Sequence, residues 1–340
     1  MNKNFLLILT LSATLTIGCK PKKIEFANIS GMAQGSTYSI VIENPSKYNP
    51  VELKKSVERI LHDFDMSVSV YNDSSVISKV NRNEDVILDT FFINVFNKSK
   101  EIFLISDGAF DITVGPLVKA WGFGPDAHKN FEVSKLDSLM KLIGFEKVKI
   151  VNNRIVKSVP GICLDVNAIA PGYSVDVICK YFKGLGMKNY LVEIGGEVRA
   201  VGDKNGTDWR IGIDRPEDNN MIPGDKLQAI IKIKSKALAT SGNYRKFYIE
   251  DGVKYAHHIN PKTGYPTKNT LLSISLIADE CATADGTATA CMVMGKDKTI
   301  EFLERHPELE AYLIYSDEEG YFRTWVSENL RKKISENSLK

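Results

Sequence analysis

One carboxylate stands among small and apolar residues in the run ATADGTATACMVMG, residues 282–295. Asp285 and Thr289 are four residues apart, so a helix would place both side chains on one face, one turn apart. A carboxylate and a hydroxyl suit a hard cation such as Mg²⁺, which takes few protein ligands and fills its shell with water and phosphate oxygens. The alternative is a core helix whose aspartate pairs with a basic side chain.

A histidine pair supplies a candidate base. His257 and His258 end a predicted strand, just before the turn NPKTGYP. A histidine beside a turn is well placed to accept a proton, although a surface or packing role is the alternative. Since side chains alternate along a strand, we expect the two rings on opposite faces, with only one serving a given site. Upstream, Gly242 has no Cβ atom, so another group can approach the backbone closely there, beside Thr240 and Ser241.

Two further segments have compositions that suit ligand binding. GAFDITVGPLVKAWGFGP, which begins at Gly108, breaks every regular period, so we predict a loop that forms either a ligand wall or a buried Ω-loop. In CLDVNAIAPGYSVDVI, a strand ends in Asp165 and Asn167, and a helix starts near Pro171. Backbone groups at that junction can hold phosphate through N–H groups or a cation through C=O groups, unless the junction is only a cap.

These candidates depend on helices that hydrophobic periodicity and capping residues predict. Asn49 caps a helix that runs to about Phe64, and Asp89 precedes one that stops at Gly108. Asp279 is expected to cap the helix that carries Asp285 and ends at Gly295. Two more helices are predicted at residues 134–143 and 171–186.

Strands with hairpin connections make up most of the remaining pattern. Asn152-Asn153 and Gly195-Gly196 are turn signals between alternating runs, and Asp251-Gly252 divides a third pair. Further strands are predicted at residues 29–43, 210–214, 227–239 and 271–278. Because hairpins outnumber βαβ units, the fold class is α+β with a mostly antiparallel sheet.

Composition, net charge and cysteine spacing indicate the broad class of the protein and which partners are not expected. With 43% hydrophobic and 25% charged residues among 340, the chain is typical of a folded globular protein. Its 44 basic and 42 acidic residues leave a net charge of +2, which gives no electrostatic reason to expect a nucleic acid partner. Beyond residue 19, the cysteines lack metal-binding spacing and are expected to be buried hydrophobes, with no structural zinc: Cys163, Cys179, Cys281 and Cys291.

The N-terminus has the pattern of a bacterial export signal. Lys3 precedes an apolar run that is too short to span a membrane, so residues 1–18 are interpreted as a signal peptide. TIGCKPKK resembles a lipobox, although Thr16 stands where Leu is usual, and it predicts lipidation of Cys19. Cleavage without lipidation is the alternative. Residues 19–28 would form a tether, followed by a single catalytic domain at 29–335.

Seven blocks, in order, resemble the signatures of the FAD:protein FMN transferases, the ApbE-type flavin transferases. They are MAQGSTYS, GAFDITVGPLVKAWGFG, LDVNAIAPGYSVD, LVEIGGEVRAVG, ATSGNYRKF, HHINPKTGYP and ATADGTATACMVMG, within residues 29–295. The resemblance implies a T-fold-like α+β catalytic domain. It also implies an exported enzyme that uses Mg²⁺ to move FMN from FAD to a threonine or serine hydroxyl, with AMP as the other product.

The resemblance also implies roles for individual residues. Asp285 and Thr289 match the metal ligands, together with the backbone carbonyl of Ala168, and His257 matches the histidine that activates the acceptor hydroxyl. Asp285 is the less favoured candidate for that base. The positions that match the FAD site are Met32, Tyr71, Ala109, Phe110, Asp111, Asp165, Pro171 and Ile259. Pro171 departs from the lysine or other polar residue of many relatives, so a contact there would come from the backbone.

The implied partners are FAD and an acceptor protein, such as a subunit of a membrane redox complex. A lipid on Cys19 would hold the enzyme on a bacterial membrane, with its catalytic domain on the periplasmic side. Two alternatives stay open. Water instead of a hydroxyl would make the protein an FAD pyrophosphatase that releases FMN and AMP, and a site without turnover would make it an FAD-binding lipoprotein.

Overall fold

The computed structural model describes residues 25–43, 48–123, 131–217, 224–243, 247–250 and 253–336. The predicted signal peptide and Cys19 lie outside these residues. Within these ranges, no helix is both long and apolar enough to cross a membrane.

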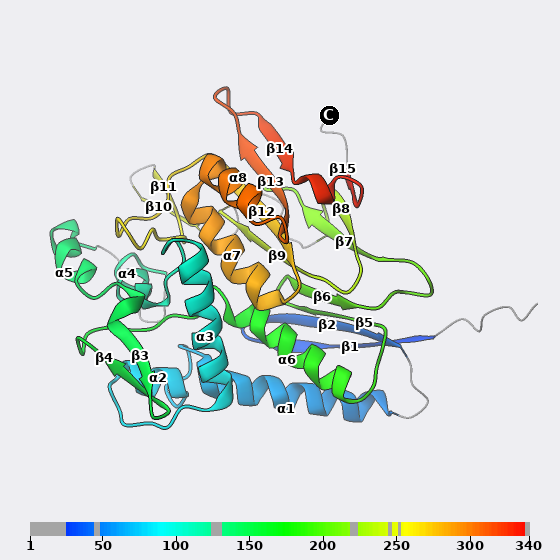
Figure 1. The fold of residues 1–340 in the computed structure, drawn as a ribbon, viewed down its shortest axis with the longest axis horizontal. Coiled ribbons are helices and arrows are strands. Elements are labelled where there is room, and N and C mark those ends of the chain that lie inside the picture. The colour runs from blue at the N-terminus through cyan, green and yellow to red at the C-terminus, as the bar shows by residue number, and fades with distance from the viewer. Residues whose placement is uncertain are drawn as a thin grey trace, which may run out of the picture.

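The core of the fold is an eight-stranded sheet in which every neighbouring pair of strands is antiparallel. In Figure 1 the strands of this sheet follow one another from β1 at one edge to β14 at the other. Its strands, in spatial order, are β1 (Phe26–Ala33), β2 (Ser36–Glu43), β5 (Tyr190–Ile194), β6 (Glu197–Val201), β9 (Ala237–Gly242), β12 (Leu271–Ala278), β13 (Glu310–Ser316) and β14 (Phe322–Val326). Alternating burial along β2 and β5 matches the sequence pattern, since one side chain in two reaches each face.

Three smaller sheets complete the strands. One contains β15 (Ile334–Glu336), β8 (Leu227–Ile233) and β7 (Trp209–Asp214), and the others are the hairpins β3–β4 (Val148–Val151, Arg154–Lys157) and β10–β11 (Phe247–Glu250, Val253–Ala256). The predicted turn between β3 and β4 is confirmed, since Asn152 and Asn153 have φ of 49° and 56°. Two successive positive φ angles are those of a type I′ turn.

The two longest described helices begin at the residues that the sequence predicted. Asn49 accepts a hydrogen bond from the Val51 N–H at the start of α1 (Pro50–Val68), and Asp89 accepts one from Phe92 at the start of α3 (Thr90–Ile105). α1 continues one turn beyond the predicted end at Phe64, because Ser67 and Val68 extend its buried face.

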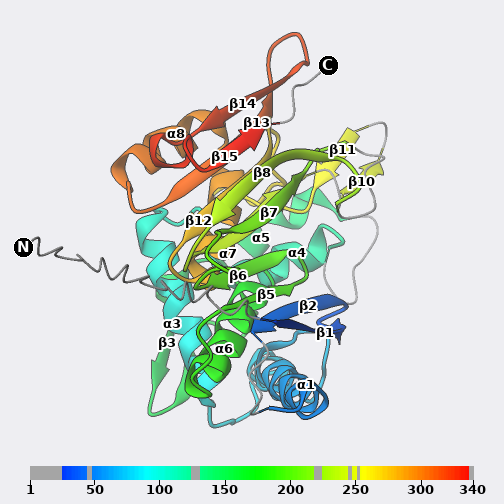
Figure 2. The ribbon, with the colours of Figure 1, turned by 90° about the vertical axis from the view of Figure 1, so that its right-hand side faces the viewer.

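The helices α6 (Ala170–Gly184) and α7 (Cys281–Met294) lie side by side on one face of the central sheet, next to α8 (Lys296–Arg305) (Figure 1). The three-stranded sheet covers the opposite face, where Trp209 and Ile231 pack against Leu238 and Tyr312 (Figure 2). The central sheet is therefore buried on both sides, and α6 and α7 are held firmly against it.

Two local predictions were wrong. The segment after Gly108 is not simply a loop, since it contains the 3₁₀ turn Ile112–Val114 and the short helix α4 (Gly115–Ala120). Asp279 does not cap α7, because its carboxylate pairs with Lys236 at 2.6 Å. The two other short helices are α2 (Val76–Asn81) and α5 (Leu136–Met140).

The four cysteines beyond residue 19 are not in disulfides. Cys179, Cys281 and Cys291 are buried as expected, whereas Cys163 is only partly buried.

Candidate functional site

The crossing of α6 and α7 brings two backbones into direct contact. A Cβ atom on Gly172 would lie 2.6 Å from the carbonyl oxygen of Cys281 and 2.7 Å from Cβ of Asp285. Neither contact is sterically allowed, so the close approach requires glycine at this position. At this crossing the Gly172 N–H donates to Oδ2 of Asp285 over 2.9 Å.

This hydrogen bond leaves a backbone oxygen without its usual partner. In a regular helix, the Gly172 N–H would bond to the carbonyl four residues earlier, that of Ala168. Here Asp285 takes that N–H, and among the described residues no group donates to the Ala168 oxygen. The junction therefore presents an open C=O group one turn before Gly172, the residue whose N–H binds the buried carboxylate.

The start of α6 offers few N–H groups to a phosphate. The amide of Ala170 bonds to Val166, that of Gly172 bonds to Asp285, and Pro171 has none. Of the two ligand types that the sequence left open at this junction, the arrangement therefore favours a cation held by oxygen.

Thr289 lies one turn beyond Asp285 on α7, as its spacing predicted, and is partly exposed. Its Oγ1 is 3.4 Å from Oγ of Ser241, which β9 contributes beside Gly242. A carbonyl, a carboxylate and a hydroxyl are the donors that a hard cation prefers. In the part of the chain that the structure describes, no three His, Cys, Asp or Glu side chains group together, so a cation here would have one carboxylate ligand and room for substrate oxygens.

Asp285 is buried, and this has a strong electrostatic effect. Burial raises its pKa from 3.8 to about 7, an effect that the negative charge of Asp176 increases and the N–H of Gly172 opposes. The carboxylate therefore lacks a compensating positive charge, which a bound cation would supply.

The predicted FAD-lining residues form two groups. The first lies near the α6 junction: Asp165 and Pro171 belong to the junction, Tyr71 is close to Asp165, and Met32 is on the β1–β2 hairpin. Met32 and Tyr71 are 70% and 64% exposed, so both side chains are accessible to a ligand. Although Tyr71 is largely exposed, partial desolvation of its phenol raises the pKa of that group, and the nearby charge of Asp165 adds to the effect, so these two side chains are close. The β1–β2 turn also reaches α6, since the Ser174 hydroxyl is 3.4 Å from Oε1 of Gln34.

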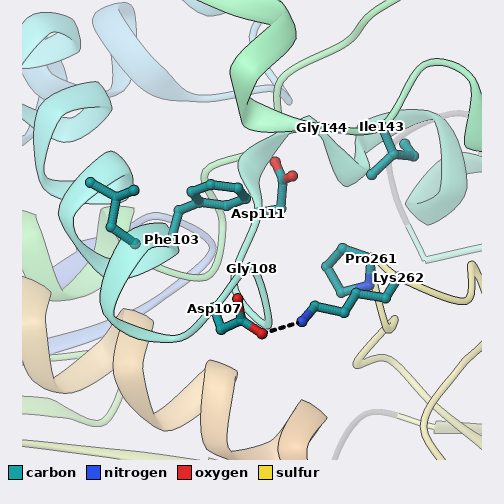
Figure 3. A pocket seen from close by; sticks show the side chains of 9 residues that line it. Phe103, Asp107, Gly108, Asp111, Ile143, Gly144, Pro261 and Lys262 are labelled. Atoms are coloured by element: carbon teal, nitrogen blue, oxygen red, sulfur yellow. Dashed lines mark hydrogen bonds and ion pairs between the residues drawn. The ribbon is translucent and has the colours of Figure 1, made fainter.

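The second group lies beside a cavity of about 300 Å³, which Figure 3 shows between the end of α3 and the NPKTGYP turn. The cavity is lined by Phe103, Leu104, Asp107, Gly108, Asp111, Ile143, Gly144, Pro261 and Lys262. Across its mouth, Lys262 Nζ and Asp107 Oδ2 form an ion pair of 2.7 Å. Asp111 is therefore on the wall of a cavity large enough for part of a nucleotide.

Side-chain packing limits the contacts that this second group can make with FAD. Phe110 is only 3% exposed and its ring lies in the core near Gly286, so it cannot stack on a flavin ring, and only the loop backbone remains for that contact. Ala109 and Ile259 are also buried. The Asp111 carboxylate accepts from the N–H and hydroxyl of Thr113 and from the N–H of Phe145, so it also holds this loop together.

The two histidines differ from their predicted arrangement. β11 ends at Ala256, so strand alternation does not extend to them, and their ring centroids are 4.0 Å apart. His258 is 4% exposed and its pKa lies well below 6.5, because of burial and the neighbouring ring. His257 is partly exposed and lies against Phe123 with 6.5 Å between ring centroids. Only His257 is accessible enough to serve as a base.

Comparison with known proteins then decides the family. Residues 34–313 match the ApbE family over most of the chain. The chain belongs to the ApbE family. The FAD:protein FMN transferase of Vibrio cholerae is 34% identical over 98% of this chain and 99% of its own length. That of Haemophilus influenzae is 32% identical, over 97% of each protein.

Solved structures of the ApbE family agree with this assignment. The flavin transferase ApbE from Vibrio cholerae superimposes with a TM-score of 0.82 at 32% identity, covering 91% of this chain and 99% of its own. The flavinyl transferase ApbE from Pseudomonas stutzeri, in its apo form, also gives 0.82, at 29% identity, over 92% and 98%. The predicted family, the α+β fold and the transferase class are thus confirmed.

Sequence reasoning missed two charged residues beside this candidate site. Asp176 on α6 contacts the first turn of α7 and pairs with Arg199 on β6. The only signal was that Asp176 stands one turn after Gly172 in GYSVD. No local pattern indicated Arg199, because β6 is distant in sequence.

The pKa of Asp285 predicts how stability depends on pH without a cation. The folded protein retains a proton that the unfolded chain releases, so this carboxyl lowers stability as pH rises from about 4 to about 7. Its contribution is at most about 1.4 kcal/mol per pH unit. Urea unfolding in a chelator should show a steeper decline in wild type than in Asp285→Asn, and equal slopes would contradict the shift.

Proposed function

We propose that this protein transfers FMN from FAD to a threonine or serine hydroxyl of an acceptor protein and releases AMP. Mg²⁺ is held by Asp285, Thr289 and the carbonyl of Ala168. The observation that carries this proposal is the displaced hydrogen bond of Gly172, whose N–H binds the buried Asp285 carboxylate and leaves the Ala168 oxygen, one turn earlier, without a donor within the described ranges. The relatives named FAD:protein FMN transferase support the choice of donor and product.

Different residues of the chain have different roles in the proposed reaction. When bound, Mg²⁺ supplies charge neutralisation on the pyrophosphate. Asp285 supplies the negative charge that would hold the cation at the α6–α7 crossing. The exposed Met32 and Tyr71 offer apolar surface to a ring of FAD. The cavity beside Asp111 has the size of a separate slot for a smaller part of FAD. His257 accepts the proton of the acceptor hydroxyl as that oxygen attacks phosphorus.

A direct assay tests the proposal. The protein is incubated with FAD, Mg²⁺ and an acceptor domain that carries a flavinylation threonine, and intact-mass measurement follows the acceptor. We expect an adduct heavier by one FMN, together with acceptor-dependent release of AMP. Equal AMP release with and without acceptor, and no adduct, would instead identify an FAD pyrophosphatase. FAD binding that is insensitive to Mg²⁺, without turnover, would identify a binding protein.

His257→Ala is expected to slow transfer by about 10²- to 10⁴-fold, because a threonine hydroxyl needs a base to become a good nucleophile. The affinity for FAD should change little, since the proposed role concerns the acceptor. Single-turnover transfer and FAD titration measure the two effects separately. The matched control is His306→Ala, which removes another partly exposed imidazole, at the end of α8 and outside the proposed site, and should keep wild-type transfer. Equal losses of transfer and FAD affinity in His257→Ala would indicate a binding role instead.

The location of the enzyme is proposed from the sequence alone. The signal at residues 1–18 and the lipobox-like Cys19 support a lipid-anchored enzyme on the periplasmic side of a bacterial membrane. Fractionation of cells that express the full chain tests this, because a lipidated protein remains with the membranes after a high-salt wash.

A further inference from the structure

The carboxylate of Asp176 caps a helix to which it does not belong. Asp176 lies on α6, and its two oxygens accept hydrogen bonds from the first two amides of α7, Cys281 at 3.0 Å and Ala282 at 2.9 Å. α7 has no cap from its own preceding residue, since the Glu280 side chain makes no capping hydrogen bond. The positive end of the α7 dipole is therefore neutralised from α6.

The two helices exchange these contacts reciprocally. On α6, Gly172 donates and Asp176 accepts, one turn apart; on α7, Cys281 donates and Asp285 accepts, also one turn apart. Each carboxylate is thus held by an amide from the first turns of the other helix. Because the backbones touch at Gly172, a shift of either helix disturbs both contacts at once.

The central sheet fixes this exchange in place. Arg199 on β6 forms an ion pair with Oδ1 of Asp176, and the two side chains are only 26% and 13% exposed. β6 is hydrogen-bonded on both sides, to β5 and β9, so the backbone that carries the Arg199 guanidinium is held rigidly in the sheet. A partly buried pair of this kind fixes geometry more than it adds stability.

We propose that Asp176, anchored by Arg199, is a positioning residue for the cation site. It fixes the first turn of α7, and this keeps Asp285 on the Gly172 N–H so that the Ala168 carbonyl stays open. Without this restraint, the Gly172 N–H returns to its ordinary helical partner, and the site loses one oxygen and its alignment with Asp285. The inference rests on the proposed function, because it assigns Asp176 to the metal site of that reaction.

Asp176→Asn tests the role, since asparagine has the same shape but loses the charge that Arg199 holds. Calorimetric titration with Mg²⁺, in the presence of FAD, should give an affinity at least 10-fold weaker than that of wild type. FAD affinity measured in a chelator should not change, and in the cation-free protein the amides of Cys281 and Ala282 should exchange hydrogen faster. Asp89→Asn is the matched control, because Asp89 also caps a helix but on α3. It should keep wild-type Mg²⁺ affinity.

The outcomes separate the two proposals. Wild type that binds no Mg²⁺ in the presence of FAD overturns the proposed metal site and the positioning role with it. Wild type that binds Mg²⁺, together with a folded Asp176→Asn protein of unchanged affinity, overturns the positioning role alone. If Asp176→Asn does not fold, Arg199→Lys decides, because it loosens the anchor and keeps the cap: weaker Mg²⁺ binding supports the role, and unchanged binding refutes it.

Discussion

Asp285→Ala is expected to reduce FMN transfer by about 10³-fold or more while the protein remains folded. The carboxylate is the only charged ligand among the three proposed, so its loss removes the anchor for the cation. Folding should survive, because burial already disfavours the ionised carboxylate and removing it relieves that cost. Steady-state transfer at rising Mg²⁺ concentration measures the first effect, and thermal unfolding in a chelator measures the second.

A second substitution separates the charge of Asp285 from its hydrogen bond. Asp285→Asn can still accept from the Gly172 N–H, so it should preserve the helix crossing while losing Mg²⁺ affinity. Comparable inactivity in both variants assigns the effect to charge. Wild-type activity of Asp285→Ala at saturating Mg²⁺ would remove this residue from the metal site.

Gly172→Ala is expected to damage both stability and cation binding. The new methyl group would lie 2.6 Å from the Cys281 carbonyl, so α6 and α7 must separate. Overpacking of this kind typically costs about 1–3 kcal/mol, and here the strain falls on the backbone of the site. Chemical denaturation measures the loss of stability, and calorimetry with Mg²⁺ measures the loss of affinity.

Gly184→Ala is the matched control for this effect. Gly184 ends the same helix, and a Cβ there would meet nothing within 4 Å. Alanine should therefore be neutral or slightly stabilising at that position. If the two alanine variants behave alike, the close contact at Gly172 is not a determinant of the site.

Local sequence predicted much of the fold because the decisive interactions are themselves local. The cap at Asn49, the cap at Asp89 and the turn at Asn152 depend on residues within four positions of each other. The same holds for the placement of Asp285 and Thr289 on one helix face, which follows from the helical repeat.

The wrong predictions concern contacts between distant segments. Asp279 had the residue type and position of a cap, but Lys236, which lies just before β9, pairs with it, and Asp176 takes over the capping. The burial of the Phe110 ring against α3 and α7 also depends on distant segments, and it favours the buried form of the loop, one of the two forms that the sequence left open. No local pattern carries this information, because it depends on which elements pack together.

The reciprocal contacts between α6 and α7 also bear on when the site forms during folding. Ala168 and Asp285 are more than a hundred residues apart in the chain, and α7 packs against the paired strands β9 and β12 as well as against α6. Contacts of such long sequence separation are slow to form, since the intervening chain must first be ordered. A partly folded chain would thus hold neither the open carbonyl nor the aligned carboxylate, which would keep it from binding the cation or cleaving FAD before the sheet is complete.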